Sequence, residues 1–274
     1  MMKPLFIFIL LFSTIGKTSS QTYDDFIRQS FDCLEKENYE CAEKALKNAM
    51  RKEPANPRNR LLLSNLGTIQ RKTGKYEDAL LSYTAALSSD PKNTILLMNR
   101  AALYAQIDSL SKALNDYNQV IEYDPDNFSA LHSAGLIYIE RGDTLSARNN
   151  FTRILKNDPR NIEGRSGFAT LSKISGDYQT AELLFSEILK EKPEMYLLYL
   201  QRSEIYLASN KLAKALEDVN VYLKEYPDDE YAYFLRGQIK YEQWERAGAC
   251  NDFQRAKLLG YDSEKLREML KKCK

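Results

Sequence analysis

Cysteine is the residue type in this chain best suited to covalent chemistry, and it occurs four times, as Cys33, Cys41, Cys250 and Cys273. No two of these cysteines have the two-residue spacing that is typical of zinc-binding pairs. In an oxidising compartment an even number of cysteines favours disulfides, and buried free thiols are the alternative. We therefore expect no metal site, and disulfides if the chain is exported.

Acid–base catalysis has few candidates, because the chain contains a single histidine, His132. One imidazole does not allow a Ser/His/Asp or Cys/His set to be assembled. The carboxylate pairs Asp24 with Asp25 and Asp228 with Asp229 fall at the starts of expected helices, where acidic side chains favour the helix dipole. The sequence thus predicts no catalytic residues, no cofactor and no enzymatic activity.

Residues 1–20 differ in character from the remainder. Lys3 precedes an apolar run from Leu5 to Ile15, which is too short to span a bilayer, and small residues lead up to Ser20. The pattern indicates a secretory signal peptide cleaved after Ser20, with a retained signal anchor as the alternative. No cysteine stands at the cleavage site, so a lipid anchor is not indicated. We expect an exported protein, periplasmic or extracellular, with no membrane span after cleavage.

The charge of the remaining chain argues against nucleic acid as a partner. Of the 39 basic side chains two lie in the signal, which leaves 37 against 38 acidic ones. Binding to nucleic acid needs a concentration of lysine and arginine, and no basic stripe is present.

Four columns of residues recur with one period, and a period of this length is typical of stacked helical hairpins. Prolines stand 34 residues apart at Pro91, Pro125, Pro159, Pro193 and Pro227. Alanine recurs, with one three-residue slip near Pro57, at Ala42, Ala79, Ala113, Ala147, Ala181, Ala215 and Ala249. A column of small residues reads Gly67, Ala101, Gly135, Ala169, Ser203 and Gly237. A column of large residues reads Tyr83, Tyr117, Phe151, Phe185, Val219 and Phe253.

These columns predict two helices in each unit. Because four residues make about one helical turn, the large side chains project from the same face as the alanines, and small residues let two helix axes approach to about 8 Å. Proline ends one helix, and an asparagine such as Asn93 caps the next. Gly74, Gly142 and Gly176 lie midway between, where a turn must separate the two helices.

The columns closely resemble the tetratricopeptide repeat, and the resemblance covers nearly the whole chain after residue 22. It implies an all-α fold, an α-solenoid in which about seven helical hairpins form a right-handed superhelix. The expected units are 23–56, 60–93, 94–127, 128–161, 162–195, 196–229 and 230–263, followed by a capping helix over 263–273. In the last unit Trp244 replaces the turn glycine, which predicts a distorted turn.

The repeat also constrains the cysteines. Cys33 and Cys41 lie in the first unit, whereas Cys250 and Cys273 lie at the opposite end of the array. A disulfide requires Cα atoms within about 7 Å, and a solenoid does not bring its ends that close. We predict a bond between Cys33 and Cys41 and another between Cys250 and Cys273.

In proteins similar to this one, the first helices of the units line a concave groove that holds a peptide or a partner's helix. The residues expected to line it here are Asn65, Met98, Asn99, His132, Leu136, Ile139, Leu200, Glu204, Leu207, Phe234, Gln238 and Tyr241. The cations with which chaperone-binding relatives hold a terminal carboxylate are not matched, so no such clamp is expected. The strip from Leu200 to Tyr241 is the preferred docking surface, and burial of its side chains by curvature or by the cap is the alternative.

The sequence therefore predicts a scaffold that binds a protein or peptide along its groove. A periplasmic assembly factor for outer-membrane or pilus components is the alternative, and an accessory module of an envelope enzyme is a third possibility. Two turns, Asp108–Leu110 and Asp143–Leu145, resemble acceptor motifs for bacterial O-glycans, and Asn127 and Asn150 begin N-glycan sequons. The sequence leaves the partner's identity and the oligomeric state open.

Overall fold

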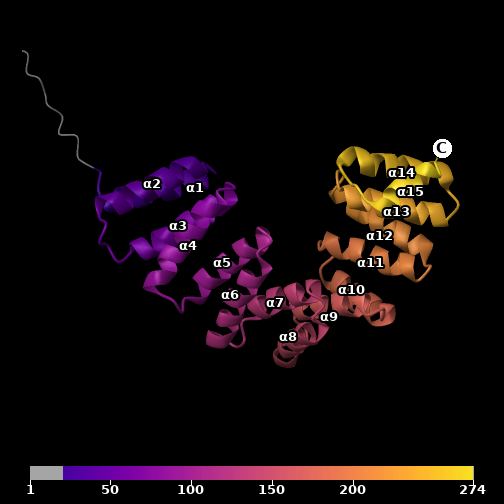
Figure 1. Cartoon of the computed structure of the whole chain (residues 1–274), viewed down its shortest axis with the longest axis horizontal. Coiled ribbons are helices and arrows are strands. Elements are labelled where there is room, and N and C mark those ends of the chain that lie inside the picture. The colour runs from indigo at the N-terminus through magenta and orange to yellow at the C-terminus, as the bar shows by residue number, and fades with distance from the viewer. Residues whose placement is uncertain (1–20, 274) are drawn as a thin grey trace, which may run out of the picture. The chain divides into compact units, whose positions relative to one another are not determined.

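The structure, a computed structural model, describes residues 21–273, so the predicted signal peptide lies outside the described residues. Within this range the chain forms fifteen α-helices and no strand (Figure 1). They are α1 (Tyr23–Glu35), α2 (Tyr39–Lys52), α3 (Asn59–Lys72), α4 (Tyr76–Ser89), α5 (Thr94–Gln106), α6 (Leu110–Tyr123), α7 (Phe128–Glu140), α8 (Thr144–Asn157), α9 (Ile162–Ile174), α10 (Tyr178–Glu191), α11 (Tyr196–Ala208), α12 (Leu212–Glu225), α13 (Glu230–Glu242), α14 (Arg246–Leu259) and α15 (Glu264–Lys271).

The helices belong to two compact units, Met1–Asn99 and Arg100–Lys274. In the first unit α1 packs on α2 and α3 on α4. In the second, α7 packs on α8, α9 on α10, α11 on α12 and α13 on α14, and α15 lies against α14. The chain is an all-α solenoid of helical hairpins. None of its helices between residues 21 and 273 has the length and apolar character needed to cross a membrane.

Every hairpin turns through one residue in the left-handed backbone region. Glycine takes this place at Gly74, Gly142 and Gly176, with φ between 76° and 79°. Other residues take it at Glu37, Asp108, Asn210 and Trp244. Trp244 has a φ of 65°, close to the glycines, so the expectation of a distorted last turn is wrong. The side chain fits because 81% of it is exposed, although a bulky residue is strained in this conformation.

The asparagines of the repeated Asp-Pro-x-Asn motif cap the first helices as expected. Asn93, Asn127 and Asn161 accept hydrogen bonds through Oδ1 from the backbone N–H groups three residues on, at 2.9 to 3.1 Å. In the first two motifs the asparagine side chain also donates to the aspartate that precedes the proline. The motif therefore ends one helix and starts the next with its own side chains.

The small and large columns meet inside the hairpins whose small residue is Gly67, Gly135 or Gly237. A Cβ built on Gly67 would come within 2.7 Å of the Tyr83 ring, and one on Gly237 within 2.6 Å of Phe253. All seven alanines of the repeated column have 0% exposure. The close approach that the small residues predict is therefore made by an aromatic ring that fills the space left by the missing side chain.

Three hairpins share one arginine–aspartate ion-pair geometry that the sequence patterns did not indicate. Arg236 Nε and Nη2 donate to the two carboxylate oxygens of Asp252 at 2.9 and 2.7 Å. Arg100 with Asp116 and Arg202 with Asp218 repeat this two-pronged geometry. In each case a first helix donates to its own second helix.

Two disulfides join the cysteines in the pairing that the sequence predicts. Cys33 and Cys41 have Cα atoms 5.8 Å apart, and those of Cys250 and Cys273 are 5.7 Å apart. The second bond ties the end of the chain to α14. Ser263 caps α15 by accepting from the N–H of Leu266, within the expected capping segment.

Candidate functional site

The second unit contains two adjoining depressions, of about 500 and 390 Å³, which share Leu207, Gln238 and Lys265. We call them together the C-terminal groove. Three successive first helices, α9, α11 and α13, contribute to its lining, and α15 forms a further wall. The groove therefore lies where the repeat predicts a binding surface, and the capping helix is part of it.

A polar cluster lies in the larger depression. Glu204 accepts a hydrogen bond from Lys173 Nζ at 2.6 Å and another from Tyr231 Oη at 2.8 Å. Burial and the neighbouring carboxylate of Glu204 raise the pKa of Tyr231, so its hydroxyl stays protonated and remains a donor. The cluster joins α9, α11 and α13. It holds the side chains of Lys173, Glu204 and Tyr231 in place and leaves the depression that they line open.

Apolar side chains surround this cluster. Ile174 is 55% exposed at the end of α9, and Leu207 is half-buried on α11. Tyr178 and Leu235 complete the apolar part of the larger depression. A surface that combines accessible apolar side chains with a few fixed polar groups suits a peptide or protein ligand.

The structure brings four of the predicted groove residues together. Glu204, Leu207, Gln238 and Tyr241 all line the C-terminal groove. They lie at the second and third positions of the predicted lining in the last two units. Each of these side chains is half-buried, so the groove reaches them from solvent.

Leu200 and Phe234, the first positions of the same two units, do not form the exposed strip that the sequence predicts. Leu200 is 6% exposed, in a core cluster with residues of α12 and α13. Phe234 is 4% exposed and packs with Phe253 and with Leu266 of the capping helix. The alternative of burial holds for both, because the next helix in the stack covers this position.

The remaining predicted residues lie elsewhere and line neither depression. Asn65 is exposed, Met98 and Asn99 are half-buried, and Leu136 is 39% exposed. His132 and Ile139 are half-buried on α7, where the imidazole lies 6.0 Å from the ring of Phe151.

His132 has the environment of a packed side chain. Burial lowers its pKa, and the nearby charge of Glu163 opposes this shift, so the ring is neutral near pH 7. No group of histidine, cysteine, aspartate and glutamate between residues 21 and 273 is arranged to hold a metal ion. The imidazole is placed to fill space beside Phe151.

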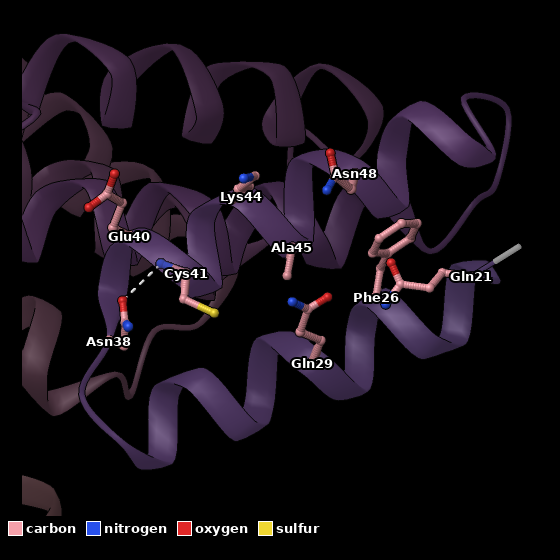
Figure 2. A pocket seen from close by; sticks show the side chains of 9 residues that line it. All are labelled: Gln21, Phe26, Gln29, Asn38, Glu40, Cys41, Lys44, Ala45 and Asn48. Atoms are coloured by element: carbon pink, nitrogen blue, oxygen red, sulfur yellow. Dashed lines mark hydrogen bonds between the residues drawn. The ribbon is translucent and has the colours of Figure 1, made fainter. Parts of the chain in front are cut away.

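A third depression, of about 520 Å³, lies between α1 and α2 in the first unit (Figure 2). Phe26 and Gln21 face Asn48 at one end, and Asn38, which caps α2 by accepting from the N–H of Cys41, lies at the other. Its lining is mostly amide and charged side chains. About half of the exposed lining is apolar, a smaller share than in the C-terminal groove, and a terminal hairpin is expected to present a face that suits water.

The sequence did not indicate that α15 contributes to the groove. Lys265, Glu268 and Lys272 are exposed to solvent, and they line the smaller depression together with Met269. The charged pattern of α15 indicates an exposed face but not what that face borders. In the structure α15 packs beside α13 and α14 (Figure 1), and its residues line the smaller depression.

Family models of the tetratricopeptide repeat match residues 34–94, 64–127 and 174–239. A solved tetratricopeptide repeat protein from Parabacteroides merdae is 40% identical, with a TM-score of 0.79, over 93% of this chain and 99% of that one. No curated protein sequence matches the chain.

Two further solved structures are similar in fold. PilW, a widely conserved type IV pilus biogenesis factor, is 19% identical over 79% of this chain and 100% of that one, with a TM-score of 0.68. Pseudomonas aeruginosa pilF is 15% identical over 78% of this chain and 97% of that one, with a TM-score of 0.64. At such identities the likeness concerns the fold alone.

Proposed function

Because this chain belongs to the tetratricopeptide repeat family, we propose that it is an exported scaffold that binds a peptide or partner protein in the C-terminal groove. Tetratricopeptide repeat proteins are generally non-enzymatic scaffolds for protein–protein contacts. The observation that carries the proposal is the groove itself, which three successive first helices and α15 line with apolar and polar side chains.

The chemistry of the groove favours a ligand with both apolar and polar groups. Ile174 and Leu207 offer apolar contacts, and Gln238 offers an amide that can both donate and accept a hydrogen bond. The carboxylate of Glu204 is already occupied by Lys173 and Tyr231. The partner is therefore expected to insert apolar side chains and to pair backbone groups with Gln238.

Export is supported by two features that are independent of the groove. The first is the signal-like pattern of residues 1–20. The second is the pairing of all four cysteines, because disulfides persist in oxidising compartments and are rare in the cytosol. Expression of the full chain followed by N-terminal sequencing tests this part, and a mature protein that begins at Gln21 is the expected result.

A narrower role in pilus or outer-membrane assembly is the second candidate that the sequence suggests. The likeness to PilW and pilF is one of fold, at 19% and 15% identity, so it does not favour that role over another exported scaffold. A role in pilus or outer-membrane assembly is therefore one form that binding of a peptide or protein in the groove can take.

The groove is tested by peptides selected from a random display library on the wild-type chain. Ile174→Glu and Leu207→Glu each place a charge where the apolar contacts are expected, and we expect each to weaken peptide binding at least tenfold. Circular dichroism checks that both variants keep the helical content of the wild type.

Matched controls are available on the outer surface of the same unit. Leu183 on α10 is 58% exposed and Leu258 on α14 is 81% exposed, and neither lines the groove. Leu183→Glu and Leu258→Glu are expected to leave peptide binding unchanged. Equal binding to all four variants and the wild type would contradict the proposed site.

A further inference from the structure

We propose that the Cys250–Cys273 disulfide is a redox switch for the C-terminal groove: its reduction releases α15, removes one wall of the groove and abolishes ligand binding. This inference rests on the proposed function of the groove and adds its regulation. The inference depends on the position of α15. The disulfide ties the C-terminal end of this helix to α14, and residues of the helix line the smaller depression of the groove.

The capping helix is a major part of the smaller depression. Lys265, Glu268, Met269 and Lys272 come from α15 or its C-cap, and Lys265 also borders the larger depression. On the opposite wall Tyr241 of α13 faces this edge, and the Lys272 ammonium lies 5.7 Å from the centroid of its ring. A ligand in the groove therefore contacts a surface that exists only while α15 is docked.

Apart from the disulfide, α15 depends on a small apolar contact with the last hairpin. It has eight residues, and helices shorter than about twelve residues are marginal in water without tertiary packing. Only Leu266 and Met269 of the helix are buried. The chain enters it after Gly260, whose φ of 109° lies in the left-handed region, and a short connection follows to the cap Ser263.

Release of α15 would uncover an apolar surface. Phe234 stacks on Tyr261 with ring centroids 4.7 Å apart and packs with Phe253 beneath Leu266 and Met269. This cluster is the core between the last hairpin and the cap. Without the cap, its rings face water, so the opened state differs from the closed one in a property that a dye can report.

The chemical step is ordinary thiol–disulfide exchange with a dithiol reductant. One thiolate of the dithiol attacks a sulfur of the Cys250–Cys273 bond, and the second thiol resolves the mixed disulfide. The products are two cysteine thiols and the oxidised, disulfide form of the reductant. Both Cys250 and Cys273 are partly exposed, so a reductant can reach this bond; in the other disulfide Cys41 is partly exposed and Cys33 is 7% exposed.

The Cys33–Cys41 disulfide supplies a matched control, because it joins α1 and α2 in the first unit and borders no part of the groove. Both bonds are removed by serine substitution, as Cys250→Ser with Cys273→Ser and as Cys33→Ser with Cys41→Ser. Only the first pair of substitutions is expected to affect α15.

The test measures hydrogen exchange and the fluorescence of anilinonaphthalene sulfonate on the full chain. We expect reduction, or the Cys250→Ser, Cys273→Ser change, to speed exchange of the α15 amides about a hundred-fold, the effect of opening a loop of this length. Dye fluorescence is expected to rise with it. The Cys33→Ser, Cys41→Ser chain should keep the slow exchange and the low fluorescence of the oxidised wild type.

A peptide selected on the oxidised chain provides the functional reading. Loss of its binding on reduction, together with release of α15, supports the switch. Release of α15 with unchanged peptide binding overturns the switch and leaves the proposed function standing. Hydrogen exchange of the α15 amides that is equal in both redox states has the same consequence. Absence of any bound peptide on the oxidised chain overturns the proposed function itself, and the switch with it, before a reductant is added.

Discussion

The ring of Phe151 lies against Gly167 so closely that a Cβ at that glycine would come within 2.2 Å of Phe151 Cε1. Gly135 approaches the same ring from α7, where a Cβ would lie 2.6 Å from Cε1 and Cζ. Phe151 has 0% exposure, so the ring has no open space into which it can move. One aromatic side chain thus requires two glycines on two different helices.

Gly167→Ala is therefore expected to destabilise the protein by about 1 to 2 kcal/mol. Overpacking of a close-packed core costs about 1 to 3 kcal/mol, and the better helix propensity of alanine returns up to about 1 kcal/mol. Urea unfolding followed by circular dichroism measures the change in the free energy of unfolding.

Gly248→Ala on α14 is the control for helix propensity. The nearest atom to a Cβ there would be the Cδ of Lys240, at 3.3 Å, which belongs to a long side chain that can yield. We expect this change to stabilise the protein by up to about 1 kcal/mol. A Gly167→Ala chain that gained as much as Gly248→Ala would show that the ring is less confined than the structure indicates.

Glu43 predicts a dependence of stability on pH in the first unit. Burial of its carboxyl opposes ionisation, but hydrogen bonds from Lys47 Nζ at 2.6 Å and Lys75 Nζ at 2.8 Å outweigh this and lower its pKa from 4.5 to about 2. Because the pKa is lower in the folded chain, the stabilisation is complete above pH 4.5. It is lost as the pH falls from 4.5 towards 2.

The Glu43→Gln chain is expected to lose this part of the pH dependence, which we place at about 1 to 3 kcal/mol. Thermal unfolding at several pH values between 2 and about 6 measures it. Glu40→Gln, on the exposed face of the same helix, is the control and should retain the wild-type slope. Parallel slopes for Glu43→Gln and the wild type would rule out the assigned cause.

Trp244 predicts a stabilising substitution. Its φ of 65° costs an L-residue with a bulky side chain about 1 to 2 kcal/mol, and 81% exposure means that little packing is lost when the ring is removed. Trp244→Gly is therefore expected to stabilise the protein by about 1 kcal/mol in urea unfolding. The neighbouring Glu245→Gly, at a φ of −82°, should give no gain.

Ser203 and Val219 take the places that a smaller residue and an aromatic ring hold in the neighbouring units, and both are fully buried. Ser203 also donates a hydrogen bond from Oγ to the carbonyl of Ala215 at 2.8 Å. We expect Val219→Phe alone to destabilise by about 1 to 3 kcal/mol through overpacking.

Adding Ser203→Gly should recover part of this loss, so that the double-mutant cycle gives a coupling of about 1 kcal/mol. Ala181→Gly combined with Val219→Phe is the control, because Ala181 lies in another hairpin and the two effects should add. Additive effects for Ser203→Gly and Val219→Phe would show that the two columns do not compensate in volume in this unit.

Local features of the fold could be predicted because each repeats. Asn127 and Gly142 mark a helix start and a turn through properties of their own side chains, namely a capping oxygen and freedom at positive φ. The cysteine pairing followed from distance along the array alone. The prediction of a distorted turn at Trp244 was wrong because tryptophan in place of glycine raises the energy of the turn without changing its backbone conformation.

The site was less predictable, because it depends on which helix covers which. Leu200 and Glu204 stand one turn apart on α11, yet α13 buries the first and leaves the second half-exposed. Nothing in the residue types of α15 indicates that Lys265 borders the same space as Lys173. These relations arise from contacts between elements, which a periodic pattern does not encode.

The ion pairs Arg100–Asp116, Arg202–Asp218 and Arg236–Asp252 each close within one hairpin. A duplication or excision of a whole hairpin therefore carries both partners of these three pairs together, so none of these aspartates loses its arginine. Gene segments that encode one such hairpin can multiply or disappear at little electrostatic cost, which gives this architecture a ready route to vary in length during evolution.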